Sequence, residues 1–417
     1  MVDRRVDLGE RISMDAIMGT GAASLERQLS KNDPGHISMT LWSLAKAGFQ
    51  PDDSITSKLA AAVAECSSDA IPQDMSTTLW ALARLSCNPD AGTVSKLAAA
   101  MAERSSDANP QDLSNTLWAV AKLDSNPDAS TVSKLAAAMA ERSSDAAPQA
   151  LSNTLWAVAK LDSNLDARTV NKLAAALAEC SNGASPQNLS NTLWAVATLG
   201  CNPDAGTVSK LAAAVAEHSN PDTQALSNTL WALAKLDSIP DAGSISNLAT
   251  AVAERSSEAA PQALANTLWA LSHPKLGWYD AHQIQVMVSA LTQHKLSPEA
   301  IAQHFSNALQ ALGSLRWYDA ALYSQLVEGV VLKISSSAPD AAGQHFSNTM
   351  FNCALSCHFD SSVDALAEWG SQQSLDHWTE QALSNALYAW AILSATAGGD
   401  TASMRKLAQH LFAEASR

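Results

Sequence analysis

Apolar residues along this chain recur with the spacing of an α-helix. In residues 109–123, "NPQDLSNTLWAVAKL", Leu113, Leu117 and Val120 stand at i, i+4 and i+7, which indicates a helical stripe and not the alternation of a strand. Pro110 suits the first helical position, because the amide it lacks has no partner within a helix at that point. The pattern predicts a helix over 109–123.

A second helix is predicted directly after a turn. Residues 124–128, "DSNPD", are rich in turn formers, and residues 128–142 return to a helical pattern rich in alanine. Asp128 is the expected N-cap, accepting hydrogen bonds from the amides of the first turn. Asn109 is expected to cap the first helix in the same way. Each unit therefore reads as two antiparallel helices.

This two-helix unit repeats along the whole chain. The tryptophan after each Thr-Leu pair recurs at intervals of 38, 38, 38, 38, 37 and 38 residues, as Trp42, Trp80, Trp118, Trp156, Trp194, Trp231 and Trp269. Weaker copies place Gln310, Phe351 and Tyr388 at the same position. Because one such pair cannot bury its own apolar faces, we predict an all-α, right-handed α-solenoid (superhelix) of about ten two-helix repeats.

The repeats also suggest how the chain is organised. We expect an N-terminal helical cap over residues 1–32 and seven regular repeats over 33–271. Residues 272–417 are expected to form three divergent repeats and a C-terminal cap. The handedness is an expectation taken from other helical-hairpin arrays.

Each tryptophan lies off the apolar stripe of its helix. On a helical wheel Trp118 falls about 140° from Leu113, beside Asn115 and Lys122. In one interpretation this flank packs between repeats, with tryptophan filling the interface and asparagine forming a hydrogen-bonded ladder. In the other, the flank lines a groove and offers single-stranded nucleic acid an aromatic platform, an amide and a cation. The sequence leaves both open.

A second recurring position varies from repeat to repeat. A residue that recognises the base sequence of a nucleic acid must vary in this way. The position directly precedes the leucine of the first helix and holds Asp74, Asp112 and Asn188, among others. The candidate RNA-binding residues come from the tryptophan flank and from this variable position. They are Asp74, Arg84, Asp112, Asn115, Trp118, Lys122, Asn153, Trp156, Lys160, Asn188, Asn191, Trp194, Asn228, Trp231 and Lys235.

Charge bears on this hypothesis in two ways. The chain has 26 basic and 41 acidic residues, a net charge of −15, which repels polyanions unless cations gather on one face. Lysines do form columns, one near the end of the first helix and one early in the second, such as Lys96 and Lys134. A simpler explanation is that they complement helix dipoles and neighbouring acids.

Signals for chemistry are weak. The sequence has no glycine-rich phosphate loop, metal-binding His-Glu helix or nucleophile elbow, so we expect no enzyme, cofactor or small-molecule substrate. Cys353, Cys357 and His358 could ligate zinc, but no second Cys/His pair has metal spacing, which favours a variant buried helix. Six cysteines in 417 residues predict reduced thiols and an intracellular protein. No apolar run is long enough for a membrane span, and no targeting peptide is clear.

The phrase "LSNTLWAVAKL", with its 38-residue period, resembles the octotricopeptide repeat family and related tryptophan- and leucine-rich repeats of organellar RNA-binding proteins. Leu113, Asn115, Leu117, Trp118, Ala119 and Leu123 carry the resemblance. It implies an α-solenoid that binds transcripts in a chloroplast or mitochondrion and acts in their processing, stability or translation. Single-stranded RNA is therefore the leading ligand. A protein or peptide partner in the groove is the alternative, and a pure spacer is a third hypothesis.

Overall fold

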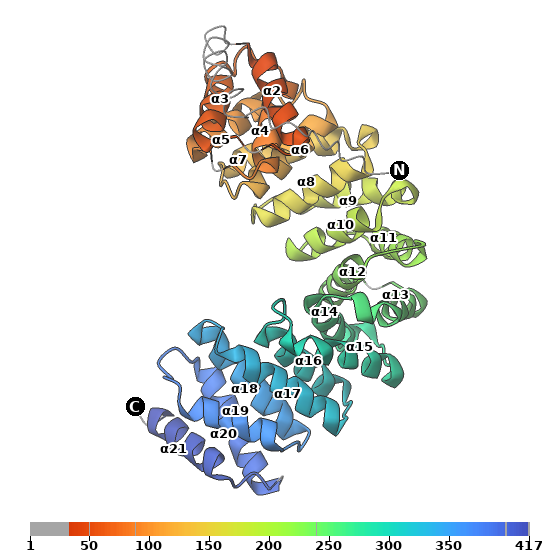
Figure 1. The fold of residues 1–417 in the computed structure, drawn as a ribbon. Helices are drawn as coiled ribbons and strands as arrows, with labels where there is room; N and C mark the ends of the chain where they lie inside the picture. Colours follow the sequence, from red (N-terminus) through yellow and green to blue (C-terminus); the bar gives the residue numbers. More distant parts are fainter. Residues whose placement is uncertain (1–32, 50, 88, 239, 397, 416–417) are drawn as a thin grey trace, which may run out of the picture. The chain divides into compact units, whose positions relative to one another are not determined.

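The computed structural model describes residues 33–415, apart from positions 50, 88, 239 and 397. This part of the chain holds twenty α-helices and five short 3-10 helices, and no strand (Figure 1). The predicted cap over residues 1–32 lies outside the described residues. The chain divides into two compact units, residues 1–176 and 177–417, and each is described by itself.

Unit 1 is built from helix pairs, in each of which a first helix beginning at a proline is followed by a second beginning after an aspartate. Its helices are α2 (Pro34–Ala47), α3 (Asp53–Glu65), α4 (Pro72–Arg84), α5 (Ala91–Glu103), α6 (Pro110–Lys122), α7 (Ala129–Glu141) and α8 (Pro148–Lys160), and α9 (Ala167–Glu179) runs across the division into unit 2. The first helices α2, α4, α6 and α8 pack side by side in that order, as do the second helices α3, α5 and α7.

Unit 2 continues the pattern with α10 (Pro186–Thr198), α11 (Ala205–Glu217), α12 (Thr223–Lys235), α13 (Ala242–Glu254), α14 (Pro261–Leu271), α15 (Ala281–Gln293), α16 (Ala302–Leu315), α17 (Ala320–Ile334), α18 (Pro339–Leu355), α19 (Ser361–Ser371), α20 (Glu380–Thr396) and α21 (Ala402–Ala415). Even-numbered helices contact the next even-numbered helix, and odd-numbered helices the next odd-numbered one. Each unit is thus an α-solenoid, and the ten helix pairs confirm the predicted repeats. The predicted division at 271/272 falls inside the seventh pair, between α14 and α15.

The caps, the first-turn proline and the apolar stripe predicted the bounds of α6 and α7 closely. Predicted spans of 109–123 and 128–142 are observed as α6 and α7, each shorter by one residue at either end. Asn109 caps α6, its side chain accepting from the Asp112 amide at 2.9 Å. Asp128 occupies the N-cap of α7, but it makes no side-chain bond to the first-turn amides. Its carboxylate accepts instead from the Ser130 hydroxyl, which corrects the prediction there.

The turn within most pairs repeats one backbone motif. A residue in the left-handed region ends the first helix, as at Asp124 (φ 52°) and Cys357 (φ 48°). The amide of the next residue then bonds the carbonyl five positions back, as from Ser125 to Val120 and from His358 to Cys353. This is a helix C-terminal motif that satisfies an otherwise unpaired carbonyl. The residue after the left-handed position is buried in some turns, as at Ser125 and His358, and half-buried in others, as at Ser163.

The apolar stripe of the first helix forms the core. Leu113 is 0% exposed, and Leu117 and Val120 are each 1% exposed. Ala119 and Ala157 are also fully buried, and their small side chains let successive first helices approach closely. The stripe read from the sequence is confirmed, and the opposite flank is left for the surface.

Candidate nucleic-acid interface

The flank opposite the core stripe carries four recurring positions, which we call the first-helix flank. In α6 these are Gln111, Asn115, Trp118 and Lys122, at successive helical spacings of four, three and four. The glutamine and lysine are exposed, whereas the asparagine and tryptophan are half-buried. In α8 the same positions, ending at Lys160, have the same exposures. The flank therefore lies at the surface, and its tryptophans are partly buried between repeats.

The tryptophan column is neither fully buried nor fully exposed. Trp80, Trp118, Trp156, Trp194, Trp231 and Trp269 are all half-buried, and Trp42 at the start of the array is 38% exposed. Each indole thus packs in part against the array and presents the remainder to solvent. Packing and ligand contact are compatible at this position.

The asparagine column is not a ladder between repeats. Gln111 Nε2 donates to Asn115 Oδ1 at 2.8 Å within one helix. The same bond joins Gln224 to Asn228, Gln344 to Asn348 and Gln381 to Asn385. Asn153 and Asn191 are half-buried at the equivalent positions. The glutamine holds its asparagine neighbour in place on the flank, and the amide row stays at the surface.

Two of the cations at the ends of the first helices, Lys46 and Lys235, lie beside indoles. Lys46 Nζ is 5.7 Å from the centroid of Trp42 and 5.4 Å from that of Trp80, so one ammonium lies over rings of two successive repeats. Lys235 does the same in unit 2, at 5.8 Å from Trp231 and 5.0 Å from Trp269. Lys46 belongs to the lysine column near the end of the first helix, although it is not among the candidate residues.

The remaining cations on the first helices of unit 1 are exposed. Arg84 and Lys122 are exposed and form no ion pair with a described residue. Lys160 Nζ lies 3.9 Å from the Asp124 carboxylate, in a pair whose side chains are 51% and 92% exposed. Such exposed pairs are worth little, so Lys160 remains available to a ligand.

The variable column lies between repeats. Asp112 is 7% exposed and accepts from the Ser76 hydroxyl of the preceding repeat at 2.9 Å. Asp74 accepts from Ser38 in the same way at 3.2 Å. Burial raises the pKa of Asp112, and the bond from Ser76 opposes that rise.

Where this column holds an alanine, the serine of the preceding repeat bonds to a backbone carbonyl, which lies in its own helix for Ser114, Ser190 and Ser347. At Ala263 the serine of the preceding repeat, Ser227, donates to the backbone carbonyl instead, at 3.0 Å. Asn188 is half-buried. This column, which the sequence suggested as a place for specificity, thus serves in contacts between repeats at Asp74 and Asp112.

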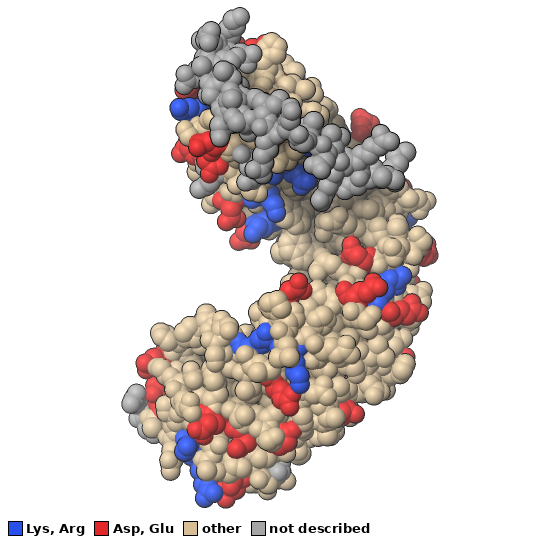
Figure 2. Space-filling model, viewed as in Figure 1, with Lys and Arg blue, Asp and Glu red and all other residues tan. Residues whose placement is uncertain are grey.

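The flank changes character toward the C-terminus. The position four residues after the tryptophan holds Thr198, Lys235, His273, Ser314, Leu355 and Ile392 in successive repeats of unit 2. Phe351 and Tyr388 take the tryptophan position and lie with ring centroids 5.4 Å apart. The last three repeats thus keep an aromatic pair but lose the cation. Across the face in view in Figure 2, charged side chains of both signs are scattered in small groups.

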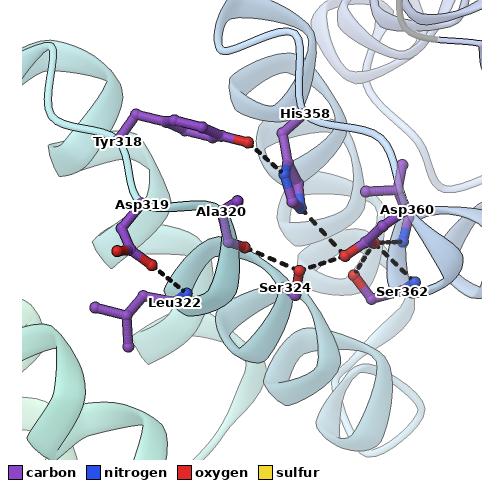
Figure 3. Close-up of polar contacts among 9 residues, drawn as sticks. Tyr318, Asp319, Ala320, Leu322, Ser324, His358, Asp360 and Ser362 are labelled. Atoms are coloured by element: carbon purple, nitrogen blue, oxygen red, sulfur yellow. Dashed lines mark hydrogen bonds and ion pairs between the residues drawn. The ribbon is translucent and has the colours of Figure 1, made fainter.

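A separate polar cluster joins the turns of the eighth and ninth repeats (Figure 3). Tyr318 Oη and His358 Nδ1 are 3.0 Å apart, and His358 Nε2 lies 3.5 Å from Asp360 Oδ2. Ser324 from α17 and Ser362 from α19 both donate to the Asp360 carboxylate. Burial lowers the pKa of His358, with Asp360 opposing the shift. Burial would raise the pKa of Asp360, but the two serine hydroxyls bring it below its ordinary value.

The thiols near this cluster differ in access to solvent. Cys353 is fully buried in α18, and burial raises its pKa, whereas Cys357 is exposed in the turn. Within the described residues, no three His, Cys, Asp or Glu side chains are grouped so as to hold a metal ion. In the same part of the chain, no helix is both long and apolar enough to span a membrane.

Comparison with known proteins relates part of the chain to translation. Residues 85–170 match a family described as "Tbc2 translation factor, N-terminal domain". No curated protein matches the chain. Among 24 matching chains of solved structures is one titled "Homology model of the full-length AP-3 complex in an intermediate open conformation". It is 10% identical, with 96% of this chain and 89% of that chain covered and a TM-score of 0.26. The protein is thus a helical-repeat chain with a segment similar to a translation-factor domain.

Proposed function

We propose that this protein binds single-stranded RNA along the first-helix flank and acts in RNA processing, stability or translation in a chloroplast or mitochondrion. The observation that carries the proposal is the repeated pairing of a half-exposed indole with an exposed cation on α4, α6 and α8 of unit 1. The segment similar to a translation-factor domain contains α6 and α8 in full. The proposed role requires no catalysis.

The residue types suit the chemistry of an unpaired strand. An indole stacks on any base and contributes about 1–3 kcal/mol per base. Lys122 and Lys160 would contact phosphates, and the amides of Asn115 and Asn153 would reach base edges. In unit 2, Asn191, Asn228 and Lys235 would offer further contacts of the same kind. We leave Asp74 and Asp112 out, because their carboxylates bond to serines of the neighbouring repeat.

Local charge supports binding despite the net charge of −15. At physiological salt, charges beyond about 8 Å of solvent are largely screened. A phosphate on the flank of unit 1 would meet the exposed Arg84, Lys122 or Lys160 at contact distance, so these cations would outweigh the more distant charges that make up the net charge. We therefore expect measurable RNA binding at low salt, with an affinity that falls steeply as the salt concentration rises.

The first test uses a fluorescent single-stranded RNA and a duplex RNA of equal length, with anisotropy measured across a salt series. We expect the single strand to bind more tightly, because only unpaired bases expose their faces to the indoles. Binding should weaken as salt rises. Absence of binding to the single strand at about 50 mM salt would contradict the proposal, since phosphate contacts are strongest there.

A protein-interaction scaffold is the second candidate function. It is favoured by the net charge and by the last repeats, where the first-helix flank has no cation and Leu355 is 54% and Tyr388 is 49% exposed. Solenoid surfaces of this kind serve as extended binding faces. Association with a defined partner that survives ribonuclease treatment would favour this function. Loss of association on that treatment would favour RNA binding.

A further inference from the structure

One interval in the cation column of unit 2 lacks its cation. Trp194 on α10 and Trp231 on α12 belong to neighbouring first helices that pack side by side. The residue four positions after Trp194 is Thr198, which is exposed and uncharged. In the following interval the equivalent residue is Lys235, whose ammonium lies over both adjoining indoles, Trp231 and Trp269.

The chain itself shows what fits such an interval. Lys46 in unit 1 and Lys235 in unit 2 each place an ammonium within 6 Å of two ring centroids, the range of cation–π attraction. Two independent repeats therefore hold a lysine head group between successive indoles. Thr198 is too short to reach that position and carries no charge. Within the described residues, no cation lies over the ring of Trp194.

We propose that the slot formed by Trp194, Thr198 and Trp231 binds a lysine or arginine side chain of a partner polypeptide. The partner's cation would take the place that Lys235 takes in the next interval. The net charge of −15 would draw a basic partner toward the chain, whereas it repels a polyanion. RNA supplies no comparable cation, so the slot differs in ligand class from the flank of unit 1, and the inference stands without the proposed RNA binding.

The test observes the two indoles directly. The full chain is labelled with ¹⁵N-tryptophan, and the Nε1–H signals of Trp194 and Trp231 are assigned by single Trp→Phe variants. Nα-acetyl-lysine N-methylamide is titrated as the cationic probe, and the norleucine derivative serves as its uncharged analogue. We expect saturable shifts of these two signals with the lysine probe and weaker ones with norleucine, because only the ammonium is attracted by the ring faces.

Substitutions separate the slot from general charge effects. Thr198→Lys supplies the missing lysine, so it should shift both indole signals without probe and weaken probe binding there by about tenfold or more. Ser314→Lys is the matched control: it adds the same charge at the same exposed repeat position, beside Gln310 instead of an indole. It should leave the response at Trp194 unchanged. Lys235→Thr should open a second slot, so that Trp269 also responds to the probe.

Three results would overturn the proposal. Equal shifts from the norleucine and lysine probes would mean an apolar contact and not a cation site. An unchanged response in Thr198→Lys would mean that the probe binds elsewhere. A saturable response of Trp194 and Trp231 to adenosine monophosphate, in the absence of a response to lysine, would assign the slot to a nucleobase.

Discussion

At the scale of single residues, the repeated tryptophan combines a packing role with a surface role. Trp118 is half-buried, while its neighbours Leu117 and Ala119 are almost wholly buried. The helical wheel predicted that the ring leaves the core stripe, because that depends only on the helix period. How deeply it sits between repeats depends on the distance between neighbouring helices, which the sequence does not contain.

The half-burial of Trp118 gives a definite prediction for stability. Trp118→Ala should lower the free energy of unfolding by about 1–3 kcal/mol, less than the ~3–5 kcal/mol of a fully buried tryptophan. Urea unfolding followed by circular dichroism measures the change. A loss below about 0.5 kcal/mol would mean that the ring contributes no packing, and a loss above about 4 kcal/mol would mean that it belongs to the core.

The variable column has a structural role that the sequence did not predict. Asp112 varies among repeats and is polar, so it was expected to face a ligand. Its partner is Ser76, 36 residues earlier in the chain. Only the register of one first helix against the next brings the two together. Variation at this position thus changes the partner of one serine. That partner is a carboxylate at Asp74 and Asp112 and the backbone carbonyl at Ala263, whereas Ser114 and Ser190, which precede alanines of the column, bond within their own helices.

At the scale of helices, local signals were sufficient to predict where most elements begin and end. Proline at the first position, a capping side chain before it and the helical stripe are all contained within a few residues. The cap at Asp128 was an exception, because Ser130 competes for its carboxylate. Close approach between helices in the divergent repeats was not predictable, since it depends on which glycine meets which aromatic ring across a pair.

Gly329 on α17 allows such an approach. A Cβ atom added there would lie 2.7 Å from ring atoms of Phe305 on α16, which is itself fully buried. Gly→Ala in a helix usually stabilises by about 0.5–1 kcal/mol. Here overpacking costs about 1–3 kcal/mol, so Gly329→Ala should destabilise the protein. Thermal and urea unfolding would measure the sign.

Gly183→Ala is the matched control, because a Cβ atom there meets nothing within 4 Å. That substitution should be neutral or slightly stabilising. If Gly329→Ala were equally harmless, the contact between α16 and α17 would be looser than the structure shows.

At the scale of the whole molecule, buried histidines are confined to unit 2 among the described residues. Burial lowers the pKa of His304, His345 and His358. The imidazoles of His304 and His345 lie close to each other. Around His358 lie Tyr318, Tyr323 and the carboxylate of Asp360. The only described histidine of unit 1, His36, is exposed.

These shifts predict how stability depends on pH. Each histidine stays neutral in the folded state below the pH at which the unfolded chain takes up a proton. The stability it contributes is therefore present above its unfolded pKa of about 6.5 and is lost as the pH falls toward the folded value. We expect a lower urea midpoint for unit 2 at pH 5.5 than at pH 7.5.

The control replaces the histidines by residues that other repeats use at the same positions. His304→Ala and His345→Ala follow Ala263, and His358→Ser follows Ser125. The triple variant should lose less stability between pH 7.5 and pH 5.5. An equal loss in both proteins would assign the pH dependence to other groups.

The repeat number and the all-α class were predictable from the sequence, because one phrase recurs with a nearly constant period. The division into two units was not, since it falls within α9 while the tryptophan spacing from Trp156 to Trp194 stays at 38. The constant tryptophan spacing shows that the repeats continue, but it does not show how tightly neighbouring repeats pack. The ligand was likewise not predictable. It depends on exposed groups, and a position can also stay constant or vary among the repeats for structural reasons.

The most direct test of RNA binding compares two pairs of lysines in unit 1. Lys122→Gln/Lys160→Gln removes two cations from the first-helix flank, and Lys96→Gln/Lys134→Gln removes two exposed cations from the second helices. The logarithm of the affinity for single-stranded RNA is measured against the logarithm of salt concentration. We predict that the flank variant binds more weakly with a slope smaller by about 1.4, or ~0.7 per lost phosphate contact, and that the second-helix variant keeps the slope of the unaltered protein. Equal slopes in both variants would contradict the account.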